Sequence, residues 1–189
     1  MKTWYERLLD ALLGGWAESQ AGKVSPGIVP GSGFGISIPF GGISDDDYAA
    51  NEAEQRAAVV AYCRRQLGEP YRLGAEGPAG SDLDEWDCSE LVLHAYAAAG
   101  LSIADGSSYQ FDFCSPVMIP RPGDLGFKWS DTWGRIGHVV VYTGDGTIVE
   151  ARGRPVGMVQ EVPEGEHYGP RWRGWRRHPG FARPKEDRT

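Results

Sequence analysis

The stretch Asp87-Cys88-Ser89-Glu90-Leu91-Val92 decides the fold of this chain of 189 residues. Apolar residues recur at helical spacing after Cys88, and Gly100 stands where such a helix would close. The pattern predicts a helix over residues 88–99, with Asp87 able to cap it. A helix N-terminus stabilises a thiolate, because its unpaired N–H groups and its dipole favour negative charge. Cys88 is therefore a candidate nucleophile.

The chain has two further cysteines, Cys63 and Cys114. An odd total of three does not suit a disulfide framework, and no pair has the spacing of a zinc site. Cys63 falls inside a predicted helix, and no helix starts at Cys114. A free cysteine is most often a small buried hydrophobic residue, and we interpret Cys63 and Cys114 in this way.

A thiolate nucleophile needs a base, and the chain has four histidines. His138 opens a predicted strand, at the edge of a buried apolar run. His94 falls on another face of the Cys88 helix and is expected at the surface. His167 and His178 lie in a C-terminal region rich in Gly, Pro and Arg. His138 is the candidate base, although a purely structural histidine fits the same position.

The turn Gly144-Asp145-Gly146 predicts a tight hairpin after the His138 strand. Counting outward from this turn, Glu150 pairs near His138, so its carboxylate can hold the imidazole in one tautomer. A cross-strand ion pair or a solvated glutamate fits the same spacing, and spacing alone leaves these readings open.

The periodicity changes along the chain. A longer helix is predicted over residues 48–67, with N-caps in Asp45-Asp46-Asp47 and an end at Gly68. After Pro120 the apolar period becomes two, which predicts short strands at 125–129, 138–143, 147–151, 158–162 and 171–177. Helices followed by an antiparallel meander indicate an α+β fold. We expect a catalytic domain over 45–180, an N-terminal segment over 1–44 and a polar tail over 181–189.

The N-terminal segment combines an amphipathic helix over residues 3–16 with a Gly/Pro-rich apolar arm. We expect this segment to pack on its own domain, to dock on a partner or to mediate self-association. No stretch has the roughly 20 apolar residues of a membrane span. The start of the chain does not resemble a secretory signal, because Glu6, Arg7 and Asp10 interrupt its apolar residues.

The amino-acid composition argues against two classes of protein. A formal net charge of −7 argues against a dedicated nucleic-acid binder, and 41% hydrophobic residues argue against a disordered chain. The C-terminal region alternates Trp172 and Trp175 with arginines. We interpret this region as an ordinary last strand. The alternative is a basic surface that binds an anionic wall polymer.

Four motifs in order resemble the NlpC-type papain-like cell-wall cysteine peptidases, over residues 59–153 and more weakly to 177. They are Leu67-Gly68-Glu69-Pro70-Tyr71-Arg72-Leu73-Gly74, Asp87-Cys88-Ser89-Glu90-Leu91-Val92, Pro122-Gly123-Asp124-Leu125-Gly126-Phe127 and the segment 137–151. The resemblance implies a papain-like fold, in which N-terminal helices pack on a C-terminal antiparallel sheet or half-barrel.

The resemblance also implies roles. Cys88 would be the nucleophile, His138 the general base and Glu150 the third polar residue, while Tyr71, Asp87 and Ser89 would bind substrate. The implied activity is hydrolysis of an amide bond in peptidoglycan stem peptides, by analogy the γ-D-glutamyl–diamino acid bond, with no metal or cofactor.

The sequence departs from the family pattern at several positions, among them Gly126, the insertion over 128–135, Glu90 and Glu150. Glu90 replaces the usual glycine after Cys-Ser and places an acidic side chain beside the nucleophile. Glu150 is more similar to the third residue of the related CHAP amidases. The alternatives are therefore an N-acetylmuramoyl-L-alanine amidase and a non-catalytic cell-wall-binding or virion structural module. Because the substrate is extracellular and no signal is recognised, we expect a phage or prophage lysin, or export by a dedicated apparatus.

Overall fold

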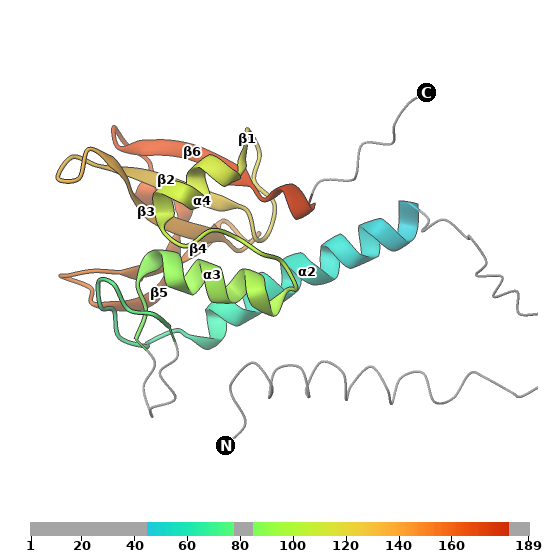
Figure 1. Cartoon of the computed structure of the whole chain (residues 1–189), viewed down its shortest axis with the longest axis horizontal. Helices are drawn as coiled ribbons and strands as arrows, with labels where there is room; N and C mark the ends of the chain where they lie inside the picture. The colour runs from blue at the N-terminus through green and yellow to red at the C-terminus, as the bar shows by residue number, and fades with distance from the viewer. Residues whose placement is uncertain (1–44, 78–84, 182–189) are drawn as a thin grey trace, which may run out of the picture. The chain divides into compact units, whose positions relative to one another are not determined.

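A computed structural model describes residues 45–77 and 85–181 of the chain (Figure 1). Three helices come first: α2 (Asp45–Arg65), α3 (Cys88–Ala98) and α4 (Ser107–Phe113). Six strands follow: β1 (Ser115–Val117), β2 (Leu125–Ser130), β3 (Arg135–Tyr142), β4 (Thr147–Arg152), β5 (Met158–Pro163) and β6 (Trp172–Arg177). Short 3-10 turns span Glu164–His167 and Pro179–Phe181. The predicted order of helices before strands is confirmed.

The strands form one antiparallel sheet in the order β1-β6-β2-β3-β4-β5. β2 to β5 are a meander, and β6 returns to pair with the free edge of β2. The hairpin between β3 and β4 closes at the predicted glycines, where Gly144 and Gly146 adopt positive φ angles of 98° and 75°. This turn sets which residues of β3 and β4 face each other.

The core lies between α3 and the sheet. α3 buries Leu91, Val92 and Ala95, and it contacts β3 and β4 with α2 alongside (Figure 1). Val139 of β3 and Val149 of β4 belong to the same buried cluster. The N-terminus of α3 is thereby held at a constant position relative to β3 and β4.

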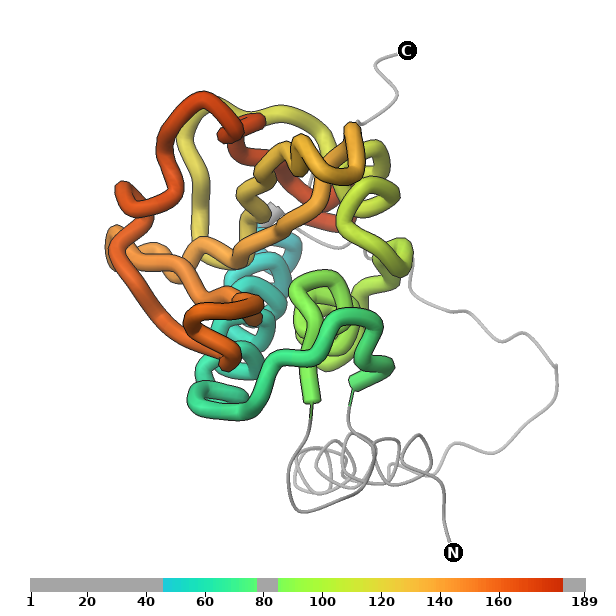
Figure 2. Tube along the Cα trace, turned by 90° about the vertical axis from the view of Figure 1, so that its left-hand side faces the viewer, coloured from blue at the N-terminus to red at the C-terminus, as the bar shows by residue number. Residues whose placement is uncertain are grey.

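The segment after α2 runs beside β5 (Figure 2). The Gly68 amide donates a hydrogen bond of 2.9 Å to the Val159 carbonyl, and the Tyr71 amide donates one of 2.9 Å to the Gly157 carbonyl. These bonds fix Tyr71 near the start of α3, since a bridge also joins Tyr71 to Trp86.

Two elements were not predicted, α4 and β1. They span seven and three residues, too short for an apolar period to show. Long-range contacts stabilise α4: Gln110 donates to the Ser89 carbonyl at 2.9 Å, and Ser108 donates to the Ile136 carbonyl at 2.9 Å. Tertiary structure, and not local propensity, makes these elements.

The last strand is confirmed as β6, and Trp172 and Trp175 pack together with ring centroids 4.9 Å apart. Residues three apart share a face here because Gly174 has a φ of 90° and the register with β2 shifts between Gly126 and Lys128. Two arginines of this strand contact the protein itself: Arg176 donates to the Cys114 carbonyl and Arg177 to Asp124. These contacts favour the structural interpretation of the strand.

The predictions for residues 1–44 lie outside the described residues and stay predictions. Phe181, the first residue of the expected tail, is buried against Tyr96, and residues 182–189 are not described. Among the described helices, none has the length and apolar character that crossing a membrane requires.

Candidate active site

Cys88 is the first residue of α3, and Asp87 caps this helix as predicted. The Asp87 Oδ1 atom accepts hydrogen bonds from the backbone N–H groups of Ser89 and Glu90, both at 2.9 Å, and from the Ser89 hydroxyl at 2.8 Å. The Gly74 amide donates to Oδ2 at 3.2 Å. Cys88 is 7% exposed. The cap therefore fixes the backbone from which the thiol projects.

His138 joins the thiol to a buried carboxylate. Its Nε2 atom lies 2.5 Å from Glu150 Oε2, and its ring also hydrogen-bonds the Cys88 side chain. Since Glu150 occupies Nε2, Nδ1 is the ring nitrogen left for the thiol. Burial lowers the pKa of His138, but the bonds and charges of Cys88 and Glu150 outweigh this effect and raise the pKa to about 9.

The register of β3 and β4 explains the contact between His138 and Glu150. Val141 pairs with Val149, so Glu150 is a diagonal neighbour of His138 on the same face of the sheet. Glu150 is fully buried, and thus the solvated alternative is wrong. The structure brings Cys88, His138 and Glu150 together in one chain of contacts.

The other carboxylate oxygen of Glu150 is also occupied. Oε1 accepts a hydrogen bond of 2.8 Å from Gln160, contacts His167 Nε2 at 3.1 Å and lies 3.3 Å from Arg152 Nη1. Burial raises the pKa of Glu150, but the hydrogen bonds from His138 and His167 outweigh it and hold the pKa well below its usual range. The carboxylate is therefore a fixed negative charge beside the imidazole.

His167 is a site residue that the sequence did not reveal. It ends the 3-10 turn Glu164–His167, its side chain is 1% exposed, and its ring stacks on His138 at a centroid distance of 6.0 Å. We expected it only in a Gly-, Pro- and Arg-rich region. No local pattern surrounds it, because the return of the chain after β5 brings it to Glu150.

His138, Glu150 and His167 present ligand atoms within 4.8 Å of one another, so by distance they could hold a divalent metal. Two features oppose this assignment. The pKa of His138 is raised, which favours a proton over a metal, and Arg152 places a positive charge on the same carboxylate. We interpret the cluster as a hydrogen-bond network.

A cleft of about 380 Å³ lies beside Cys88. Its lining includes the three predicted substrate-binding residues, Tyr71, Asp87 and Ser89, together with Tyr109, Trp133 and Arg135 from α4 and the β2–β3 region. Burial raises the pKa of Tyr71 to about 12, and the negative charges of Cys88 and Asp87 add to the rise. Tyr71 and Cys88 thus line the same cleft. Ser89 is buried, with its hydroxyl bound to Asp87.

The remaining candidates are structural. Burial raises the pKa of both Cys63 and Cys114 to about 12, which suits small buried hydrophobic residues. The surface prediction for His94 is wrong: it is half-buried, edge-to-face with Trp86 at 5.5 Å. Glu90 is buried too, and its carboxylate lies 3.6 Å from His94 Nε2 on the next turn of α3.

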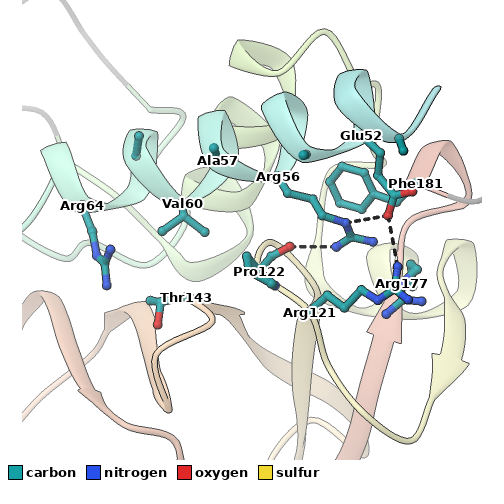
Figure 3. A pocket seen from close by; sticks show the side chains of 13 residues that line it. Glu52, Arg56, Ala57, Val60, Arg64, Arg121, Pro122, Thr143, Arg177 and Phe181 are labelled. Carbon is teal, nitrogen blue, oxygen red and sulfur yellow. Dashed lines mark hydrogen bonds and ion pairs between the residues drawn. The ribbon is translucent and has the colours of Figure 1, made fainter. Parts of the chain in front are cut away.

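A larger cavity, of about 1020 Å³, does not contain the site (Figure 3). It lies along α2, where Arg56 donates to Glu52 and to the Pro122 carbonyl at 2.7 Å each (Figure 3). Arg56 also pairs with the buried Asp124 at 3.0 Å. No residue of the Cys88 cleft lines this cavity.

The chain is similar to known proteins in sequence and in fold. A probable endopeptidase of Mycobacterium tuberculosis is 32% identical over 143 residues, which cover 72% of this chain and 35% of the relative. The chain thus spans about a third of the length of that relative. The solved structure of the peptidoglycan hydrolase RipB from Mycobacterium tuberculosis aligns with a TM-score of 0.58 at 27% identity, covering 90% of this chain and 78% of RipB.

A second solved structure, RipD from Mycobacterium tuberculosis, is described as a non-catalytic NlpC/p60 domain protein adapted to peptidoglycan binding. It aligns with a TM-score of 0.53 at 23% identity, covering 65% of this chain and 95% of RipD, and shares the fold. Residues 68–177 match the model of the NlpC/P60 family, and this range includes Cys88, His138 and Glu150. The chain belongs to the NlpC/P60 family.

Proposed function

We propose that this protein is a cysteine endopeptidase that hydrolyses amide bonds in peptidoglycan stem peptides, with Cys88 as nucleophile, His138 as base and Glu150 as orienting residue. One observation carries the proposal: His138 contacts the Cys88 thiol and the buried Glu150 carboxylate at once, beside an open cleft. A nucleophile, a base and an orienting group within bonding reach are the requirements of covalent acyl transfer.

The first chemical step is attack on the substrate carbonyl. His138 holds the thiol proton on Nδ1, as its raised pKa indicates, and the Cys88 sulfur adds to the carbonyl carbon to form a tetrahedral intermediate. Of the first amides of α3, Ser89 and Glu90 donate to the Asp87 side chain and Leu91 to the Asp87 carbonyl. The Cys88 N–H is thus the amide left to bind the oxyanion, with the helix dipole behind it.

The second step breaks the amide bond. The intermediate collapses to a thioester, and His138 gives its proton to the leaving nitrogen. A water then attacks the thioester with His138 as base, which releases the carboxylic acid and restores the thiol. Glu150 stays ionised throughout and stabilises the imidazolium, as its lowered pKa requires.

The bond cleaved, the γ-D-glutamyl–diamino acid amide, is part of the proposal and rests on the resemblance alone. An N-acetylmuramoyl-L-alanine amidase would use the same groups on a neighbouring bond. A non-catalytic binding protein is the further alternative, since RipD shows that the fold also serves that purpose. A phage origin and a dedicated export route stay predictions.

The test is digestion of purified peptidoglycan, followed by mass spectrometry of the released fragments. We expect fragments with a new γ-glutamyl carboxyl end from the wild type and none from Cys88→Ala. Stem peptides with a free L-alanine amine, released from glycan strands that stay intact, would instead identify an amidase. A wild type that binds the wall but releases nothing would identify a binding protein.

A further inference from the structure

The short helix α4 contacts both elements that carry the proposed nucleophile and base. It packs against α3, which begins at Cys88, and against β3, which carries His138 (Figure 1). The first residues of α4, over 107–109, line the cleft beside Cys88. Gln110, the next residue, is fully buried and does not line the cleft.

Gln110 connects α4 to the first turn of α3. Its side-chain Nε2 atom donates a hydrogen bond of 2.9 Å to the backbone carbonyl of Ser89, the residue that follows Cys88. The carboxylate of Asp87 accepts hydrogen bonds from the N–H group and the hydroxyl of the same serine. The backbone next to the nucleophile is thus held by two side chains, one from the helix cap and one from α4.

Two serines connect α4 to β3. The Ser108 hydroxyl donates a hydrogen bond of 2.9 Å to the backbone carbonyl of Ile136, and the Ser107 hydroxyl donates to the same carbonyl at 3.4 Å. Ile136 lies on β3, two residues before His138. These bonds therefore hold the backbone of β3 close to the proposed base.

The part of β3 that carries His138 is paired with a strand on one side only. β2 pairs with β3 from Arg135 to Val141, whereas β4 pairs with β3 only at Val141 and Tyr142 within the described sheet. The backbone at His138 therefore has no second strand to fix it there. The bonds from α4 supply a contact to this segment that the sheet does not.

Folding stability does not explain why an amide is buried at position 110. The Oε1 atom of Gln110 is buried and has no hydrogen-bond partner among the described residues. Burying an amide with its oxygen unpaired costs free energy, and an apolar side chain of similar size would avoid this cost. The bond from Nε2 to Ser89 accounts for an amide at this position better than stability does.

We propose that Gln110 is a positioning residue, which together with Ser108 holds the start of α3 and the His138 segment of β3 at a fixed separation, so that the thiol and the imidazole stay in contact. We call these two bonds the α4 brace. The inference rests on the proposed function, because it concerns the same Cys88–His138 pair. Gln110 acts through this pair and not by touching substrate, so its loss should lower kcat and leave KM nearly unchanged.

The test replaces Gln110 with methionine, which has a similar volume and cannot donate a hydrogen bond. We expect kcat to fall about tenfold, since a displacement of about 1 Å in a catalytic group can cost about 100-fold in rate. We expect the unfolding temperature, followed by circular dichroism, to stay unchanged or to rise, which a merely structural role would not allow. Asp112→Asn, an exposed change on the same helix, is the matched control and should leave kcat and KM unchanged.

Two further readouts do not need turnover. The contact with Cys88 raises the pKa of His138, so Gln110→Met should move the His138 titration, followed by NMR, to lower pH. The same variant should slow the alkylation of Cys88 by iodoacetamide. Ser107→Ala/Ser108→Ala, which removes both donors to Ile136, should have the same two effects. Adding Gln110→Met to this double variant should change little more, because the separation is already free once one end of the brace is lost.

Several results would overturn the α4 brace. One is a wild-type kcat and an unchanged His138 titration in Gln110→Met. Another is effects of the glutamine and serine variants that simply add, because the two ends would then act separately. If Gln110→Met does not fold, the serine variant decides in its place, and an unchanged His138 titration there would overturn the brace.

The two proposals fail in different ways. A wild type that hydrolyses no wall peptide would overturn the endopeptidase proposal. The His138 titration and the alkylation rate would then decide the brace by themselves.

Discussion

The Nε2 atom of His167 lies 3.1 Å from Oε1 of Glu150, the carboxylate oxygen that His138 does not use. The two histidines therefore hold opposite oxygens of one buried carboxylate and fix its plane. His167 acts on the reaction through Glu150 and not by touching substrate, which makes it a positioning residue.

His167→Phe should keep the ring volume and remove the hydrogen bond. We expect kcat/KM to fall about tenfold, the value of one hydrogen bond to a charged group, with KM little changed. We expect the pKa of Glu150 to rise, because a bond that lowers it is lost. His167→Gln, which can still donate, should recover part of the rate. A pH–rate profile measures both effects, and wild-type kinetics in His167→Phe would remove His167 from the site.

The pH dependence follows from the raised pKa of His138. The imidazolium forms in the folded protein up to a pKa of about 9, against 6.5 for an unperturbed histidine. Its stabilising contribution is therefore complete below pH 6.5 and is lost as the pH rises through about 9. We expect kcat/KM and thermal stability to decline over this range.

The same pKa can be tested by variants. In Cys88→Ala the thiol no longer raises the pKa of His138, so the His138 imidazole should titrate at a lower pH when followed by NMR. An unchanged titration in this variant would show that Cys88 and His138 do not interact.

The cysteine assignment predicts selective chemistry. Iodoacetamide should inactivate the protein by labelling Cys88, since burial raises the pKa of Cys63 and Cys114 to about 12 and keeps both thiols protonated. Cys88→Ser should abolish hydrolysis and leave the fold intact, whereas Cys63→Ala and Cys114→Ala should retain activity. Peptide mapping locates the label, and a label on Cys114 that accompanies inactivation would contradict the assignment.

Glu150 should matter for both rate and stability. Glu150→Gln keeps the shape and loses the charge, so we expect a loss of about tenfold in kcat/KM. Glu150→Ala should cost more, and it should lower the free energy of unfolding by about 3 kcal/mol because its buried partners lose their acceptor. Glu161→Gln is the matched control: Glu161 is on the adjacent strand β5 and pairs with the exposed Arg64. If Glu150→Ala and Glu161→Gln behave alike, Glu150 has no special role.

Deletion of residues 1–44 should leave a folded domain, because α2 begins at Asp45 and the described core lies beyond it. We expect activity on small soluble peptides to be unchanged or higher. Insolubility of the shortened protein would place the N-terminal segment in the core, and a folded protein without activity would place it in the site.

Several features of this protein are local, and the sequence alone determined them. Asp87, Cys88 and the apolar period of α3 lie within one stretch, so the cap and the nucleophile position were predictable. The turn at 144–146 sets the register of one hairpin, so the approach of Glu150 to His138 was predictable too. Both follow from hydrogen bonds and periods that span a few residues.

Other features depend on residues that are far apart in the chain, and only the tertiary structure decided them. His167 reaches Glu150 after the turn that follows β5, and α4 is held by bonds to Ser89 and Ile136. A sequence pattern shows which side chains lie on the same helix or strand. Burial in a common core decides which helices and strands pack together, and this packing sets the electrostatic environment of each side chain.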